Sequence, residues 1–152
     1  MSEDESTSST QGAMMMPATR TPDMELALPA RATNIAVVRH AFGALGEAFA
    51  VDEEILANIR LAVTEACTNV VIHAYPDEHE GLLEVTATML GEHELEVVVR
   101  DEGPGIGPRA DSPGLGLGLP LIVLLTESVQ LGRGADERTE VRMTFPLSGA
   151  RP

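Results

Sequence analysis

The stretch that most limits the fold of this chain runs from residue 51 to residue 75 and is mostly apolar. Its apolar residues recur at helical spacing and Asp52 suits a helix N-cap, so we predict one long helix. The apolar face of this helix would be formed by Leu56, Ile59, Val63, Ala66, Cys67 and Val70. Such a face has to pack on a sheet or on a neighbouring helix, which indicates a domain with a core.

Two polar residues, Glu65 and Asn69, lie one turn apart on another side of this helix, among small or apolar neighbours. One interpretation is a solvated face, but such a face usually carries several charges, as Glu53, Glu54 and Arg60 do just upstream. The other is that Glu65 lines a cleft, where a cation or a reacting hydroxyl compensates for the lost hydration of the carboxylate. We favour the cleft.

Periodicity and turn residues predict the remaining elements. In chain order we expect a strand at 24–30, a helix at 32–49, the long helix, a hairpin of strands at 82–90 and 94–100, a glycine- and proline-rich loop at 101–120, a helix at 121–131 and a strand at 138–147. Thr33 or Asn34 should lie near the first cap, and Pro120 in the first turn of the last helix. This order predicts an α+β fold, a two-layer sandwich with helices covering one face of a mixed, mostly antiparallel sheet.

Composition excludes several classes of function. The 152 residues suffice for one domain, which we expect at 23–148, between a disordered polar tail at 1–22 and a short tail at 149–152. A net charge of −14 argues against nucleic acid or an anionic membrane as the main partner. All ten basic residues are arginine, so a P-loop lysine is excluded.

The single cysteine and the distribution of apolar residues indicate where in the cell the protein is expected. Cys67 is the single cysteine, which excludes an internal disulfide and a multi-cysteine metal site. We see no apolar run that approaches the ~20 residues of a membrane span, and the N-terminus lacks the basic start and apolar middle of a secretory signal. We therefore expect a cytoplasmic protein that does not insert into a membrane.

Two glycine-rich stretches follow the predicted hairpin. In the first, Asp101 ends a β-rich run, and Gly103 and Gly105 come next. The second leads into a helix through Gly114, Gly116 and Gly118. Glycines let the backbone approach a ligand closely, and a helix N-terminus attracts anions. Either stretch alone could be a linker or an ordinary turn, but together, after the Glu–Asn helix, they predict a nucleotide site that holds phosphates without lysine.

With these motifs in order, the sequence resembles the GHKL ATPases, which include gyrase, heat-shock chaperones and histidine kinases. The motifs are E-x-x-x-N on a helix, D-x-G-x-G after a strand, and a G-x-G loop before a helix. The segment TEACTNVVIHAYP is most similar to the anti-sigma-factor serine/threonine kinases of that superfamily. The resemblance covers residues 25–147.

The resemblance implies ATP as substrate and Mg²⁺ as cofactor. By position in the family motif, Glu65 would be the general base that takes the proton from the attacking hydroxyl. Asn69 would coordinate the Mg²⁺ that bridges the ATP phosphates. Asp101 would accept a hydrogen bond from the adenine amino group, and Thr139 matches a family threonine near the adenine.

The glycines take their implied roles from the same resemblance. Gly103 and Gly105 would shape the adenine pocket and the start of a lid, whereas Gly114, Gly116 and Gly118 would line the phosphates. The lid between Gly105 and Gly114 has eight residues, fewer than in better-known members of the family. A short lid closes less completely over ATP and excludes less water, which weakens the expectation of a fast kinase.

Three functions are compatible with this resemblance. The first is an anti-sigma factor that sequesters a sigma factor and phosphorylates a STAS-type anti-anti-sigma protein. The second is a non-catalytic nucleotide-binding module that acts by protein contact. The third, a histidine-kinase fragment, is disfavoured because no long dimerising helix with an acceptor histidine is present. The family also implies partner contacts on the helix at 34–49, with Arg39 as a candidate, and homodimerisation.

Overall fold

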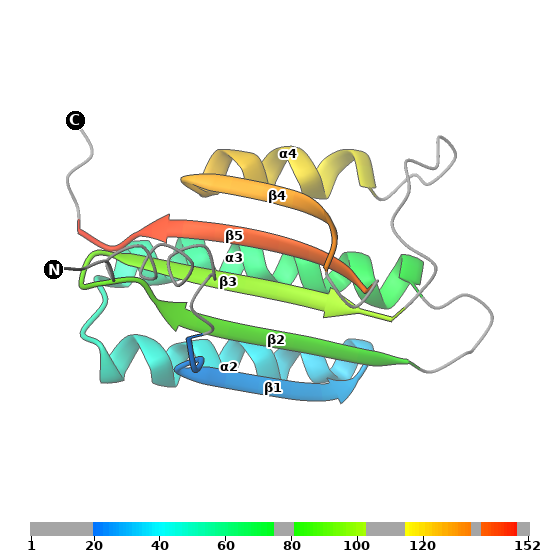
Figure 1. Cartoon of the computed structure of the whole chain (residues 1–152), viewed down its shortest axis with the longest axis horizontal. Helices are drawn as coiled ribbons and strands as arrows, with labels where there is room; N and C mark the ends of the chain where they lie inside the picture. The colour runs from blue at the N-terminus through cyan, green and yellow to red at the C-terminus, as the bar shows by residue number, and fades with distance from the viewer. Residues whose placement is uncertain (1–19, 75–80, 103–114, 135–137, 149–152) are drawn as a thin grey trace, which may run out of the picture.

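Alternating apolar residues build a single five-stranded sheet in the computed structural model, which describes residues 20–74, 81–102, 115–134 and 138–148 (Figure 1). The elements are β1 (Met24–Pro29), α2 (Ala32–Ala48), α3 (Glu53–Asn69), a π-helix η2 (Val70–Ala74), β2 (Leu82–Met89), β3 (Glu94–Asp101), α4 (Leu115–Leu125), β4 (Ser128–Arg133) and β5 (Thr139–Pro146).

The sheet has the strand order β1-β2-β3-β5-β4, and each of the four pairings within the described residues is antiparallel. The three α-helices lie side by side behind one face of the sheet (Figure 1). The predicted two-layer α+β sandwich is therefore confirmed, as are the β2–β3 hairpin and the strand at the start of the domain.

The core lies between the sheet and α3. The central strands bury alternate residues, and α3 meets them with the apolar face that helical periodicity predicts. The largest buried side chains come from both layers: Phe42, Ile59, Leu83, Leu95, Ile122, Met143 and Phe145. The span Glu53–His73 is long and apolar enough, at 21 residues, to cross a membrane by length and composition. Since its apolar face packs in this core, it is the core helix of the domain.

Helices α2 and α3 pack closely because α2 carries glycines at the contact. A methyl group added to Gly46 would lie 2.4 Å from Cδ2 of Leu56, so the Leu56 side chain occupies the space that any larger residue would need. Gly43, one turn earlier, faces the Arg60 guanidinium with more room, 3.9 Å from the added carbon to Nη1.

The helix caps were predicted with mixed success. Asp52 is the N-cap of α3, as expected, and its carboxylate accepts a hydrogen bond from the Glu54 N–H at 3.1 Å. The N-cap of α2 is Arg31, which makes no side-chain capping bond. Thr33 and Asn34, which were predicted to lie near this cap, follow it by two and three residues. Asn34 instead donates from Nδ2 to the Pro29 carbonyl at 2.7 Å, which ties α2 to the end of β1.

The prediction for the last helix was wrong at both ends. The helix begins at Leu115 rather than after Pro120, which lies inside it, and it ends at Leu125. The poor helix propensity of Gly116 and Gly118 hid its first turns. Residues 128–131, predicted as helix, belong instead to strand β4, which hydrogen-bonds along β5. That pairing joins residues far apart in the chain, so local periodicity could not reveal it.

Candidate nucleotide site

The elements that carry the predicted site residues converge at one end of the molecule. The C-terminal end of α3 with η2, the end of β3, the start of α4 and the start of β5 all lie at the right in Figure 1. Helices α3 and α4 pack against each other, and β5 pairs with β3. Motifs that are separated by up to 74 positions in the chain, from Glu65 to Thr139, thus meet at the same end of the sheet.

Asp101 and Thr139 are direct cross-strand partners, one at the end of β3 and the other at the start of β5. Both side chains are on the sheet face that the helices cover, since they continue the buried rows of Val99 and Val141. Asp101 is 1% exposed and Thr139 6%, which makes them the two polar residues in otherwise apolar buried rows.

The Thr139 hydroxyl is buried and has no hydrogen-bond partner among the residues that the structure describes. Buried polar groups are nearly always hydrogen-bonded, so an unpaired hydroxyl next to a buried carboxylate suits a ligand with its own polar edge. An ionised carboxylate only accepts hydrogen bonds, whereas a hydroxyl both donates and accepts. Together Asp101 and Thr139 offer a binding surface for an amino-substituted heterocycle, and adenine fits this description.

Glu65 and Asn69 lie on the last turns of α3. Asn69 is 7% exposed and is the final residue of the regular helix, while Glu65, one turn earlier, is half-buried. A half-buried carboxylate differs from the freely solvated Glu53 and Glu54 at the start of the same helix, which are exposed. The burial supports the cleft interpretation of Glu65, and the roles of Glu65 and Asn69 stay predictions.

The helix changes its winding immediately after Asn69. Residues Val70–Ala74 form a π-helix, where a continuous α-helix up to Tyr75 was predicted. Single π-helical turns are rare and are frequently found at functional sites. The turn contains His73, whose Nε2 is buried without a hydrogen-bond partner in the described part of the chain. No pattern in the amino-acid sequence predicts either the π-helical turn or the unpaired nitrogen.

The glycine motifs are described only in part. Gly103, Gly105 and Gly114 lie outside the described residues. Gly116 and Gly118 belong to the first turns of α4, which begins at Leu115. The first four N–H groups of a helix have no partner within it, so the backbone around these glycines can donate to an anion. That arrangement is compatible with phosphate binding in the absence of lysine.

The residues present fit magnesium only together with a substrate. Within the described residues, no cluster of three or more His, Cys, Asp or Glu side chains could hold a metal ion. Mg²⁺ is usually bound by one or two carboxylates and by substrate phosphates, so its binding here would depend on the phosphates of a nucleotide, with the amide oxygen of Asn69 as the predicted protein ligand. The single thiol takes no part in such a site, because Cys67 is fully buried on the apolar face and burial raises its pKa to about 12.

Comparison with known proteins places this geometry in a family. The family model of the histidine kinase-like ATPase domain matches residues 28–145, most of the chain and every element from the end of β1 to β5. The chain belongs to the histidine kinase-like ATPase family. The GHKL resemblance read from the three motifs is thereby confirmed.

Among curated proteins, the chain is similar to serine-protein kinases named RsbW. The serine-protein kinase RsbW of Bacillus velezensis is 30% identical over 143 residues, which cover 84% of this chain and 88% of that protein. RsbW of Bacillus subtilis is 28% identical over the same shares of both chains. These matches support the resemblance to anti-sigma-factor kinases, since they extend over nearly the full length of both proteins.

Solved structures agree on the fold. The crystal structure of the RsbU and RsbW domains of a Mycobacterium tuberculosis protein superposes with a TM-score of 0.66 at 23% identity, covering 84% of this chain and 32% of that one. A blue-light-activated histidine kinase from Erythrobacter litoralis gives a TM-score of 0.56 at 24% identity over 74% of this chain and 41% of that one.

Proposed function

We propose that this protein binds ATP and acts as a serine/threonine protein kinase and anti-sigma factor in the cytoplasm. It would sequester a sigma factor and phosphorylate a STAS-type anti-anti-sigma protein. The proposal divides the chain into a catalytic domain at 23–148 and two tails, 1–22 and 149–152. The observation that carries it is the buried Asp101–Thr139 pair at the end of the sheet, whose hydrogen-bonding groups would complement the edge of an adenine base. The membership of the chain in a family of ATPases supports the same proposal.

Adenine recognition would rest on complementary hydrogen bonding. The Asp101 carboxylate would accept a hydrogen bond from the exocyclic amino group, and the Thr139 hydroxyl would form a hydrogen bond with the same base. Gly103 and Gly105, directly after β3, would let the backbone pass close to the ring. Gly114, Gly116 and Gly118 would bring backbone N–H groups to the phosphates at the start of α4.

Phosphoryl transfer would use the two polar residues of α3. Asn69 would hold Mg²⁺, which neutralises charge on the phosphates. Glu65 would accept the proton of the attacking serine or threonine hydroxyl as its oxygen bonds to the γ-phosphorus, with ADP as leaving group. Residues four apart share a helix side, so the base and the metal ligand can serve the same phosphate, as in-line transfer requires.

The negative net charge of the chain would favour release of the phosphorylated product. A phosphate adds about −1.5 to −2 charges to the antagonist, and this chain carries −14. Repulsion would favour release of the phosphorylated antagonist and leave the kinase available for a sigma factor. The helix α2 with Arg39, which is exposed, is a candidate contact surface, and homodimerisation is proposed from the family alone.

The alternative is a non-catalytic module whose nucleotide only tunes a protein-binding surface, and the eight-residue lid favours it. Glu65→Gln separates the two. If Glu65 is the base, the substitution lowers the rate of phosphotransfer to an antagonist by about 10²–10⁴-fold, with Mg-ATP affinity unchanged within about twofold. Equal rates for both proteins would refute the assignment of Glu65. A wild type that binds ATP but transfers no phosphate would establish the alternative.

A further inference from the structure

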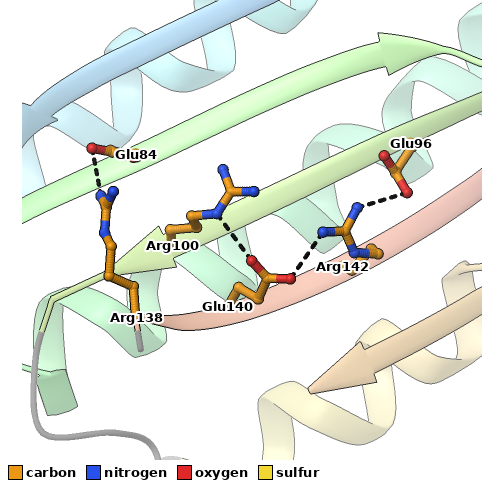
Figure 2. Close-up of polar contacts among 6 residues, drawn as sticks. All are labelled: Glu84, Glu96, Arg100, Arg138, Glu140 and Arg142. Carbon is orange, nitrogen blue, oxygen red and sulfur yellow. Dashed lines mark hydrogen bonds and ion pairs between the residues drawn. The ribbon is translucent and has the colours of Figure 1, made fainter. Parts of the chain in front are cut away.

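The sheet face turned away from the helices carries a cluster of charged side chains, which we call the ionic cluster (Figure 2). It contains three acids and three arginines: Glu84, Glu96, Arg100, Arg138, Glu140 and Arg142. The ionic cluster is therefore neutral in a chain with a net charge of −14, and it uses three of the ten arginines. Its side chains are only 13–33% exposed, so water screens them less than it screens free surface pairs.

Four of the six residues of the ionic cluster belong to β3 and β5, which are neighbouring strands. Glu140 accepts from Arg100 Nε at 3.0 Å and from Arg142 Nη2 at 2.9 Å, and Arg142 Nη1 lies 2.9 Å from Glu96 Oε2. Burial alone lowers the pKa of Arg142, but its hydrogen bonds and charge interactions with Glu96 and Glu140 outweigh that effect and raise it.

The remaining pair reaches further across the sheet. Arg138 directly precedes β5 and Glu84 is on β2, so β3 lies between them in the strand order. Arg138 Nη2 nevertheless lies 2.5 Å from Glu84 Oε2, passing over β3 on the open face. Among the four ion pairs of the ionic cluster, this one connects strands that are not neighbours.

The register places this long pair directly behind the nucleotide site. Asp101 has Leu83 and Thr139 as its two cross-strand partners. Glu84 follows Leu83 and Arg138 precedes Thr139, so each member of the pair is one residue from that row. Successive side chains alternate between faces. The pair therefore connects β2 to the start of β5 on one side of the sheet, while Asp101 and Thr139 face the helices on the other.

Thr139, the first residue of β5, pairs with Asp101 of β3 on one side and with Arg133 of β4 on the other. Residues 135–137 lie outside the described residues, and a backbone bond from Gly134 N–H to the Arg138 carbonyl, 2.8 Å, connects β4 to the residue before β5. Strand ends open more easily than strand centres. A bond that fixes Arg138 therefore also fixes Thr139, whose hydroxyl has to stay in place beside the Asp101 carboxylate.

We propose that the Glu84–Arg138 ion pair is a positioning clamp that holds Thr139 against Asp101 and thereby sets the affinity of the site for the adenine base. The inference rests on the proposed nucleotide site. It predicts that breaking the clamp weakens binding of the base more than it weakens the fold.

Adenosine is the suitable probe, because it is uncharged and any salt dependence of its binding then comes from the protein. We expect Glu84→Gln and Arg138→Gln each to raise the dissociation constant for adenosine by about three- to tenfold. In the wild type, affinity should fall by roughly the same factor as salt rises from about 0.05 to about 0.5 M, and Glu84→Gln should abolish that dependence.

Glu96→Gln is the matched control, since it breaks an ion pair of similar exposure near the other end of β3. It should shift the thermal midpoint about as much as Glu84→Gln, yet leave adenosine affinity and its salt dependence unchanged. The charge-exchanged double variant, Glu84→Arg with Arg138→Glu, should recover much of the affinity. Equal adenosine affinity in Glu84→Gln and Glu96→Gln would overturn the clamp. A folded wild type that binds neither adenosine nor ATP would instead overturn the nucleotide site itself.

Discussion

At the scale of single residues, two polar side chains, Asp101 and Thr139, are buried in the apolar interior of the domain. Both are at the end of rows that otherwise consist of valine, leucine, methionine and phenylalanine. The Thr139 hydroxyl has no hydrogen-bond partner among the described residues, and burying such a group has a cost in folding free energy. Asp101 could be recognised from the sequence because glycines follow it, but the position of Thr139 opposite it depends on a strand register that local patterns do not contain.

Thr139→Val tests whether this cost serves ligand binding. Valine keeps the shape and removes the buried hydroxyl, which lacks a partner among the described residues. We expect the nucleotide-free protein to gain about 1 kcal/mol or more in free energy of unfolding, measured by urea denaturation. Affinity for Mg-ATP should fall by about two- to tenfold. A valine variant that is less stable than the wild type would show that the hydroxyl has a structural role instead.

Cys67 predicts a specific pH dependence of stability. Burial raises its pKa from 9.0 to about 12, so above pH 9 the unfolded chain loses a proton that the folded chain retains. Stability should therefore fall by about 1.4 kcal/mol per pH unit as pH rises from 9 towards 12. Urea denaturation between pH 8 and 10.5 should show this slope, and Cys67→Ala should lack it. Parallel curves for the two proteins would contradict the buried, protonated thiol.

At the scale of elements, helical and strand periodicity predicted most segments, and the failures have physical causes. The first two helices and the β2–β3 hairpin follow from amphipathic patterns of ordinary length. Helix α4 was misplaced because glycines occupy its first turns, and β4 was missed because its pairing with β5 comes from tertiary structure. The π-helical turn after Asn69 has no local sequence signature at all.

The contact between α2 and α3 makes a prediction at this scale. Gly46→Ala places a carbon 2.4 Å from Leu56 Cδ2, so the helices must separate or Leu56 must move. We expect a loss of about 1–3 kcal/mol in free energy of unfolding. Gly43→Ala is the control, because its added carbon meets Arg60 at 3.9 Å, an ordinary contact. The better helix propensity of alanine should make that variant neutral or more stable. Equal stability of the two variants would refute the close packing.

At the scale of the whole molecule, the elements that carry the proposed nucleotide site meet at one end of the sheet, while the open face carries the ionic cluster (Figures 1 and 2). The sandwich architecture could be predicted from the order of elements. The strand order could not, since β5 lies between β3 and β4. That insertion is what brings Thr139 beside Asp101 and Arg138 within reach of Glu84. The site is therefore a product of topology as much as of its motifs.

Calorimetric titration with Mg-ATP is the decisive test of whether Asp101 recognises the adenine of ATP. The wild type should bind, and Asp101→Asn, which replaces one acceptor oxygen by a donor, should bind about ten- to hundredfold more weakly. Thermal unfolding without nucleotide should confirm that the variant is folded. A wild type that binds neither ATP nor ADP would refute the nucleotide site. A folded Asp101→Asn variant that binds as tightly as the wild type would refute adenine recognition by Asp101.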